Sequence, residues 1–255
     1  MKPKIQHTRR LQRRAFTLVE MLVVIAIIAI LAGILIPVVG RAKTKAKVAA
    51  ARVEMAGLET AIKSYKNDYN RWPIPKKPIG STRWANRGGD FTYGVTAPTY
   101  VTPGNEALME ILMAVDSKKT DGTSRGFNPM SSRNPKKNKY IEPKESGEAN
   151  GFPGLSLYDA TDSANMSGRF HDPFGNPYFI SIDLNADGFC ADHAYLEPAL
   201  SGDLVGLVSY KLSSAGSDIF GYKGGVMIWS AGPDKQLGAG KATEGANEDN
   251  ILSWR

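Results

Sequence analysis

The sequence predicts an α+β fold in which one long N-terminal helix packs on a small antiparallel β-sheet in the C-terminal region. Residues 18–39 form an apolar run with a single charge, and about 20 apolar residues suffice for a helix that spans a bilayer. Apolar residues then recur every three or four positions as far as Tyr69, which is typical of an amphipathic helix. After residue 170, short apolar segments alternate with turns, as in a sheet. The apolar face of the helix needs a partner surface, and this sheet is the simplest one.

An ordinary secretory signal does not explain the apolar run. Such signals have an apolar region of roughly 7–15 residues before a small-residue cleavage site, and residues 18–39 exceed that length. Basic residues lie on both sides of the run, so they indicate its orientation only weakly. A plain membrane anchor is the simplest alternative. Glu20 argues against it, because an ionisable group inside an apolar span is costly and usually has a function.

The helix is expected to run from Phe16 to about Asn70. Pro37 should bend or loosen it, because proline removes one backbone donor and clashes with the preceding turn. Trp72-Pro73 should end it. Its later half carries one apolar stripe, formed by Val48, Ala51, Met55, Leu58, Ile62, Tyr65 and Tyr69.

Less regular elements are expected beyond the helix. Residues 76–104 are rich in Gly, Pro and Thr and predict a loop with a short strand, whereas 105–115 predict a short amphipathic helix. Residues 117–154 predict a long loop, so we expect 76–154 to be a variable region that faces a partner. Four strand segments are expected: 178–184, a return strand that begins at Phe189 after the turn 185–188, 204–212 and 225–230.

Composition excludes several function classes. The chain has 255 residues and a formal net charge of +7, but the basic excess is N-terminal and residues 53–255 carry a net charge of −3, which argues against a nucleic-acid binder. Cys190 is the single cysteine, so no intrachain disulfide can form. His7, His171 and His193 are scattered and lack the spacing of a zinc site. No catalytic arrangement is evident, and an enzyme has little support.

Residues 13–20 (RRAFTLVE), followed by the apolar run, resemble the processing signal of type IV pilins and type II secretion pseudopilins. The resemblance implies cleavage between Ala15 and Phe16 by a prepilin peptidase, followed by N-methylation of Phe16. Glu20 then becomes the fifth mature residue and Pro37 the twenty-second, as in the family. The family favours glycine before the cut, where this chain has Ala15. Cleavage would remove six basic residues and leave a formal net charge of +1.

The same resemblance implies a role for Glu20 in filament assembly. Its carboxylate would face the new α-amine of a neighbouring subunit and fix the axial register, because an unpaired charge is costly in a low-dielectric setting. The alternative is that Glu20 merely reaches the lipid headgroup zone.

The resemblance divides the chain into five regions. These are a cleaved cytoplasmic leader (1–15), a transmembrane and filament-core helix (16–40), an amphipathic helix (41–72), a variable loop-rich region with a short helix (73–170) and a C-terminal β-sheet region with an acidic loop (171–255).

Two further segments resemble the major pseudopilin family of type II secretion, protein G. One is the turn DPFGNPY at 172–178, and the other is the C-terminal tail at 228–234 and 248–254. Members of that family bind calcium in the C-terminal loop, and the corresponding residues here are Asp234, Glu248 and Asp249. Calcium is therefore expected as a ligand, because it accepts a mixture of carboxylate and carbonyl oxygens. The alternative is a solvated acidic loop.

A weaker metal candidate lies at Asp183, Asn185 and Asp187. With Gly188 these residues match the first half of an EF-hand loop, but Ala194 stands where the bidentate acid should be. A tight hairpin turn explains the same residues.

The resemblance implies a structural subunit of a type II secretion pseudopilus that polymerises through its N-terminal helix and drives protein export. Implied partners are a homo-oligomeric filament, minor pseudopilins, the prepilin peptidase and methylase, and the inner-membrane assembly platform; no nucleic acid is implied. The implied location is the inner membrane, crossed once, with the C-terminal head in the periplasm. Two alternatives stay open: a type IV pilus subunit for adhesion, motility or DNA uptake, and a membrane-anchored periplasmic binding module or enzyme.

Overall fold

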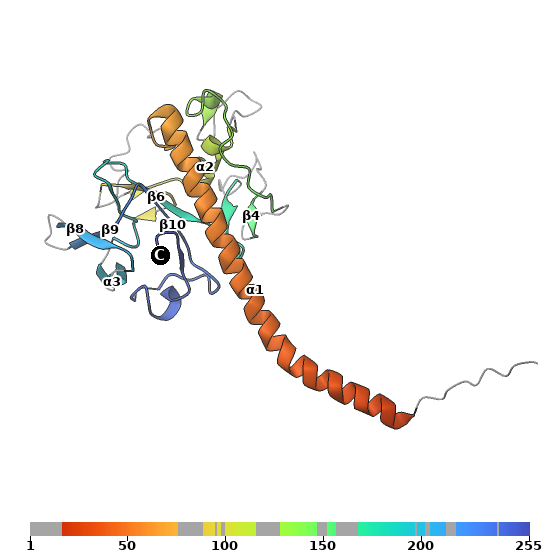
Figure 1. Cartoon of the computed structure of the whole chain (residues 1–255). Coiled ribbons are helices and arrows are strands. Elements are labelled where there is room, and N and C mark those ends of the chain that lie inside the picture. The colour runs from red at the N-terminus through yellow and green to blue at the C-terminus, as the bar shows by residue number, and fades with distance from the viewer. Residues whose placement is uncertain are drawn as a thin grey trace, which may run out of the picture. The chain divides into compact units, whose positions relative to one another are not determined.

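The computed structural model (Figure 1) describes residues 17–75, 89–94, 96–97, 100–115, 128–146, 152–156, 168–196, 198–201, 205–212, 218–238 and 240–255. The chain divides into two compact units, with the boundary between Lys45 and Ala46. The second unit, Ala46–Arg255, is called the head domain below.

Helix α1, Leu18–Tyr69, is the predicted long helix. In its first part, up to Lys45, every side chain is exposed except the half-buried Ala32. By length and composition α1 is long and apolar enough to cross a membrane. Pro37 lies inside it without ending it. Since proline has no N–H, the hydrogen bond to the carbonyl one turn back is missing there.

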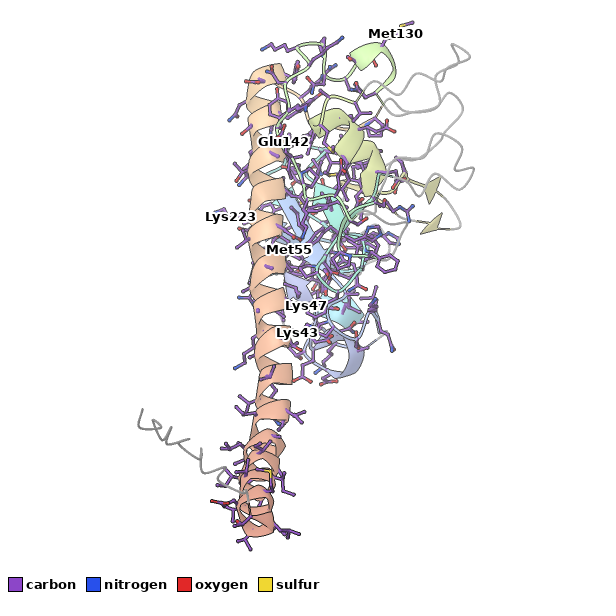
Figure 2. The ribbon with its side chains drawn as sticks, turned by 90° about the vertical axis from the view of Figure 1, so that its right-hand side faces the viewer. Lys43, Lys47, Met55, Met130, Glu142 and Lys223 are labelled. Carbon is purple, nitrogen blue, oxygen red and sulfur yellow. The ribbon has the colours of Figure 1, made fainter. Side chains whose placement is uncertain are left out.

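The part of α1 in the head domain buries the predicted stripe. Ala51, Met55, Leu58, Ile62 and Tyr65 are buried, Val48 and Tyr69 are half-buried, and Ala61 is an additional buried member. Met55 points from α1 toward the strands beside it (Figure 2).

The end of α1 follows from local sequence. Asn70, which follows its last residue, has φ 51°, the left-handed conformation that commonly terminates helices. The predicted end near Asn70, ahead of Trp72-Pro73, is confirmed.

A four-stranded antiparallel sheet forms the centre of the head domain. Its order is β1 (Phe91–Thr92), β6 (Phe179–Ile182), β10 (Val226–Ser230) and β11 (Ile251–Leu252). Strand β10 is buried along its whole length. Alternate residues point to opposite faces of a strand, so a strand that is buried along its whole length is covered on each side.

The two cores of the head domain are distinct. Val226 and Ile228 of β10 belong to the core that contains the α1 stripe, whereas Met227 and Trp229 belong to a second core. The central sheet is therefore the middle layer, with the later half of α1 alongside β6 and β10 in Figures 1 and 2.

The second core also rests on a three-stranded antiparallel sheet of β7 (Phe189–Cys190), β9 (Asp218–Lys223) and β8 (Val208–Leu212). The strand at Phe189 was predicted to return along β6, and this pairing is wrong. Both edges of β6 are occupied by β1 and β10, so β7 pairs with β9 instead. The remaining elements are β2 (Thr96–Ala97), β3 (Tyr100–Val101), β4 (Gly154–Leu155), β5 (Phe170–His171), α3 (Pro198–Ser201) and the 3₁₀ turns η1 (Pro129–Ser131) and η2 (Gly245–Asn247).

Helix α2, Asn105–Leu112, is the predicted short helix, but all eight of its residues are buried. Asn105 fixes its start, because its side-chain amide donates to the carbonyls of Phe170 (2.9 Å) and Tyr178 (2.8 Å). The expectation that 76–154 as a whole faces a partner is therefore wrong for α2, which is part of the first core.

Residues 128–146 are held against the helices of the head domain by hydrogen bonds. The buried Asn134 donates to the Ile111 carbonyl (2.9 Å) and accepts a hydrogen bond from the Tyr69 hydroxyl (2.7 Å). The Tyr140 hydroxyl donates to the Asp68 carboxylate (2.7 Å). The segment is largely a loop, as predicted, but these hydrogen bonds hold it against the last turns of α1 and α2.

Replacing Leu58 with alanine tests the packing of α1 on the central sheet. Leu58→Ala should lower the free energy of unfolding by about 2–5 kcal/mol, because Leu58 is fully buried and its loss leaves a cavity. Urea unfolding of the full chain in detergent micelles measures the change. Val53→Ala is the matched control on the same helix, since Val53 is 73% exposed, and it should change stability by no more than about 0.5 kcal/mol. Equal effects of the two substitutions would contradict the packing described.

Candidate functional site

Glu20 lies in the first turn of α1, where it forms a capping box with Thr17. The Glu20 carboxylate accepts hydrogen bonds from the Thr17 backbone N–H and hydroxyl, both at 2.8 Å, and the Glu20 N–H donates to the Thr17 hydroxyl at 3.2 Å. This reciprocal pair satisfies backbone donors that a helix start leaves without partners.

The capping role of Glu20 was missed in the sequence, although the signal was present. Thr-x-x-Glu ahead of an apolar run is the pattern of a capping box. Glu20 is exposed, so its carboxylate is held at the helix start and is also accessible to a neighbouring chain. Ala15 and Phe16, the predicted cleavage and methylation residues, lie outside the described residues.

The predicted calcium residues of the C-terminal loop are brought together only in part. The Asp234 N–H donates to Asp249 Oδ2 at 3.1 Å, so these two residues meet across the loop. Burial and the neighbouring Asp234 carboxylate raise the pKa of Asp249. Glu248 is exposed on the preceding 3₁₀ turn. Within the described ranges, no three acidic, His or Cys side chains are gathered as a metal site.

One oxygen in this loop fits a cation. Asp249 Oδ1 is buried and has no hydrogen-bond partner. The side-chain oxygen of Asn250 is also buried and also lacks a hydrogen-bond partner. Two neighbouring carboxylates with a buried oxygen lacking a donor suit a hard cation such as calcium. Asp234 and Asp249 are therefore the two residues present that fit calcium, and within the described part of the chain no hydrogen bond joins the exposed Glu248 to either of them.

Asn247 holds the acidic loop together without any metal. It is buried, and its side-chain amide donates to the carbonyls of Gly238 (3.1 Å) and Gly240 (2.8 Å), while its side-chain oxygen accepts from the Gly238 N–H (2.9 Å). No sequence pattern predicts this role, because an asparagine in a loop is common.

The weaker metal candidate forms a tight turn after β6. The Gly188 N–H donates to Asp183 (3.1 Å), the Asp187 N–H to Asn185 (3.0 Å) and the Phe189 N–H to Asp187 (2.9 Å). Asp183, Asn185 and Asp187 therefore lie on one turn, as the spacing predicted.

Asp90 joins this turn from a distant segment and was not predicted. It is fully buried, and its carboxylate accepts hydrogen bonds from the N–H groups of Leu184 (3.1 Å) and Ala191 (2.7 Å). Burial, aided by the neighbouring Asp183 and Asp187 carboxylates and opposed by the two backbone hydrogen bonds, raises the pKa of Asp90 to about 7.

The turn at 172–178 is organised by Asp172, which is fully buried. Its carboxylate accepts from the N–H groups of Phe174 and Asn176, both at 2.8 Å, and from the Ser230 hydroxyl at the end of β10. Asn176 in turn donates to the Gly232 carbonyl at 2.7 Å. The motif thus joins the start of β6 to the segment that follows β10.

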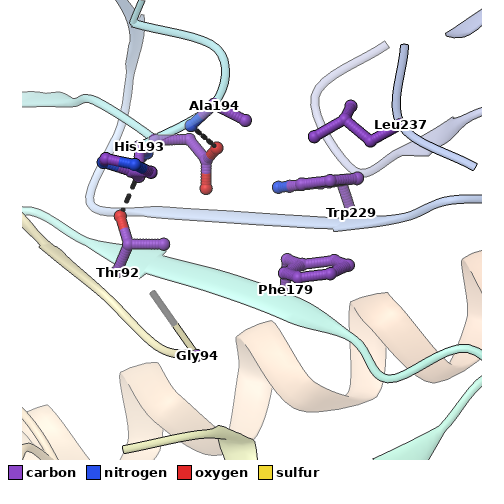
Figure 3. Close-up of a pocket in the computed structure, with 8 residues that line it drawn as sticks. Thr92, Gly94, Phe179, His193, Ala194, Trp229 and Leu237 are labelled. Carbon is purple, nitrogen blue, oxygen red and sulfur yellow. Dashed lines mark hydrogen bonds between the residues drawn. The ribbon is translucent and has the colours of Figure 1, made fainter. Parts of the chain in front are cut away.

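A pocket of about 150 Å³ lies in the head domain (Figure 3). Its floor is formed by Trp229 stacked on Phe179, with ring centroids 4.2 Å apart. The lining residue Asp192 accepts a hydrogen bond from the Ser181 hydroxyl at 2.6 Å, but Ser181 does not line the pocket and both side chains are buried. A buried hydroxyl cannot attack a substrate, so this contact gives the enzyme alternative no support. The lining residues are Thr92, Gly94, Phe179, Asp192, His193, Ala194, Trp229 and Leu237.

Comparison with known families identifies the N-terminal segment. Residues 10–36 match the family described as "Prokaryotic N-terminal methylation motif". The chain carries a prepilin-type N-terminus. This match includes the predicted cleavage pair Ala15 and Phe16 and the capped Glu20.

Curated relatives are similar over part of the chain. The type IV major pilin protein PilA of Myxococcus xanthus is 35% identical over 86 residues, which cover 34% of this chain and 38% of the relative. The type II secretion system core protein G of Pseudomonas aeruginosa is 32% identical over 90 residues, or 32% of this chain and 63% of the relative. Core protein G of Pectobacterium carotovorum is 40% identical over 68 residues, or 27% and 44%. The chain thus spans less than two thirds of the length of these relatives, and no solved structure matches it.

The pKa of Asp90 predicts a specific pH dependence of stability. A free aspartate has a pKa of about 3.9, so between about pH 4 and pH 7 the folded state binds more protons at Asp90 than the unfolded state. The free energy of unfolding therefore loses this contribution as the pH rises through that window. Asp90→Asn should flatten the dependence when urea unfolding is measured at several pH values with EDTA present.

The exposed Asp218 provides the control for this measurement. Asp218→Asn should leave the slope of stability against pH as in the unsubstituted chain. An unchanged slope in Asp90→Asn would contradict the raised pKa.

Proposed function

We propose that this chain is a pseudopilin, a structural subunit of a type II secretion pseudopilus. It is cleaved after Ala15, methylated on Phe16, and polymerises through its N-terminal helix to drive protein export. The observation that carries this proposal is the methylation motif at residues 10–36, which leads directly into the capped start of α1. The similarity to core protein G in several bacteria supports secretion as the process.

The exposed first part of α1 supports assembly through this helix. Eighteen or more apolar side chains in sequence need a non-aqueous surrounding, which is lipid before assembly and other helices in a filament. Ala26, Ala29 and Gly33 provide small side chains at helical spacing, which allow helices to approach closely. The proposed location is accordingly the inner membrane, crossed once, with the head domain in the periplasm.

The proposed partners follow from this assembly. They are further copies of the chain, minor pseudopilins, the prepilin peptidase and methylase, and the inner-membrane assembly platform. The proposed role is mechanical and not enzymatic, in keeping with relatives that are named as pilins, fimbrial proteins or secretion core proteins.

A type IV pilus subunit for adhesion, motility or DNA uptake is the second candidate. The similarity to PilA of Myxococcus xanthus and to a fimbrial protein of Neisseria meningitidis favours it. A pilus extends beyond the cell surface. Filaments of this chain seen on the surface of cells whose secretion system is unaltered would therefore support the pilus over the pseudopilus.

Substitutions of Glu20 test the assembly role, because its charge and its capping function can be separated. Glu20→Gln keeps an acceptor for the capping box but removes the charge, whereas Glu20→Ala removes both. Both variants should be cleaved, and mass spectrometry should find methylated Phe16 as the first residue of each. Incorporation into filaments should fall at least about tenfold in both, because an α-amine buried without its partner costs several kcal/mol.

The control for this experiment is Glu59→Gln. Glu59 forms an exposed pair with Lys63 (2.6 Å) on the same helix within the head domain, so its loss should leave filaments normal. Normal filaments from Glu20→Gln would show that capping, not charge, is what assembly requires. An unprocessed N-terminus in the unsubstituted chain would overturn the proposed function itself.

We also propose that the C-terminal loop binds calcium through Asp234 and Asp249. The support is their contact across the loop and the buried Asp249 oxygen without a donor. Calcium should raise the melting temperature of the full chain in detergent, and Asp249→Asn should reduce that rise, because it removes one carboxylate ligand. Glu248→Gln, at an exposed neighbour, should have a smaller effect. An identical calcium response in Asp249→Asn and the unsubstituted chain would contradict this site.

A further inference from the structure

The turn between β6 and β7 contains a buried polar atom without a partner. Asp183 is 5% exposed, and its Oδ1 atom has no hydrogen-bond partner. Its other oxygen accepts from the Gly188 N–H at 3.1 Å, so the carboxylate faces the turn and Oδ1 lies there with it. A buried charged acceptor left without a donor is destabilising, so a ligand at this atom would be stabilising.

The neighbouring side chains of the turn supply further oxygens. Asn185 and Asp187 each accept a backbone N–H from within the turn, at 3.0 Å and 2.9 Å, and the Asn185 amide donates to Asp187 Oδ2 at 2.9 Å, so the two side chains lie together on the turn. Both are exposed, so solvent ions reach them. Among the described residues, no Lys or Arg forms an ion pair with Asp183 or Asp187.

Asp90 brings a third carboxyl group to the same turn. It reaches the turn because the residue before it, Gly89, has φ 99° and lies so close to Asn185 that a Cβ atom there would be 2.6 Å from the amide nitrogen. Its hydrogen bonds to the N–H groups of Leu184 and Ala191 hold both ends of the turn in place.

We propose that the turn 183–189 binds a divalent cation, with calcium the best fit, through Asp183 Oδ1 and the side-chain oxygens of Asn185 and Asp187. Backbone carbonyls and water complete the six to eight oxygens that calcium prefers. These two carboxylates and one amide form a site separate from the C-terminal loop. The bound divalent cation would offset the charge of the two carboxylates. Asp90 is a positioning residue, since its carboxylate already accepts two backbone N–H groups.

The absence of an acid at Ala194 sets the affinity. An EF-hand closes its site with a bidentate glutamate at the twelfth position, and this turn lacks one. The expected dissociation constant is therefore about 0.1–1 mM, as in extracellular calcium modules.

Cation binding at this turn would stabilise the junction between the two sheets. Strand β6 ends at Ile182 in the central sheet, and β7 begins at Phe189 in the three-stranded sheet. An ion held between these ends restrains the connection. The stability of the head domain would then depend on calcium at two separate loops.

The test uses the full chain in detergent micelles carrying Asp234→Asn and Asp249→Asn, which removes the C-terminal candidate. After treatment with EDTA and its removal, calcium chloride is titrated by calorimetry, and the melting temperature is followed in parallel. The expected result is one site of about 0.1–1 mM and a rise in melting temperature. Asp183→Asn and Asp187→Asn, added singly, should each weaken the affinity at least about tenfold.

Two controls make the result specific. Asp218→Asn removes the same charge from an exposed position outside the turn and should leave calcium binding unchanged. Substitution of the buried Asp183 could unfold the turn, whereas Asp187 is exposed. Weaker binding in Asp187→Asn therefore reports loss of a ligand and not misfolding. The proposal would be overturned if calorimetry detected no heat of calcium binding to the chain that carries Asp234→Asn and Asp249→Asn. It would also be overturned if both Asp183→Asn and Asp187→Asn left calcium binding unchanged. Neither outcome bears on filament assembly, which the Glu20 variants test separately.

Discussion

The burial of one stripe of α1 on the central sheet is the constraint on which the head domain depends. The stripe from Ala51 to Tyr65 and alternate residues of β6 and β10 form one core, to which α2 adds its buried face. Because β10 is apolar on both faces, the central sheet also supports the second core around Trp229. A single helix face thus organises a domain that otherwise consists mainly of short strands and loops.

The loops are held by buried amide and carboxylate side chains. A chain with one cysteine cannot form an internal disulfide, and long irregular segments leave many backbone groups to be satisfied. Asn105, Asn134, Asp172 and Asn247 each make several hydrogen bonds to backbone groups of such segments. Asn105 and Asn134 join segments that are distant in sequence, whereas Asn247 holds together a local loop.

The capping box at Glu20 and the proposed cation site at the turn after β6 differ in how far apart their residues lie in the sequence. At the start of α1, Glu20 and Thr17 are three residues apart, so their capping box forms within one helical turn and requires no other part of the fold. In the head domain, Asp90 and Asp183 are far apart in sequence, and only the packing of β1 beside β6 brings their carboxylates to one turn. The capping of Glu20, the residue proposed to act in assembly, is therefore local, while the proposed cation site at the turn depends on tertiary structure.

Local periodicity and the preferences of proline and asparagine suffice to predict the long helix, its apolar stripe, its end near Asn70, and the strands at 178–184 and 225–230. The methylation motif is likewise evident in the sequence, because it is a contiguous segment. The pairing of β7 with β9, the complete burial of α2 and the position of Asp90 beside Asp183 become evident only in the folded chain. Strand partners and buried polar contacts join residues that are distant in sequence, so competition for the edges of β6 and for space in the core settles them, and no local pattern records that competition.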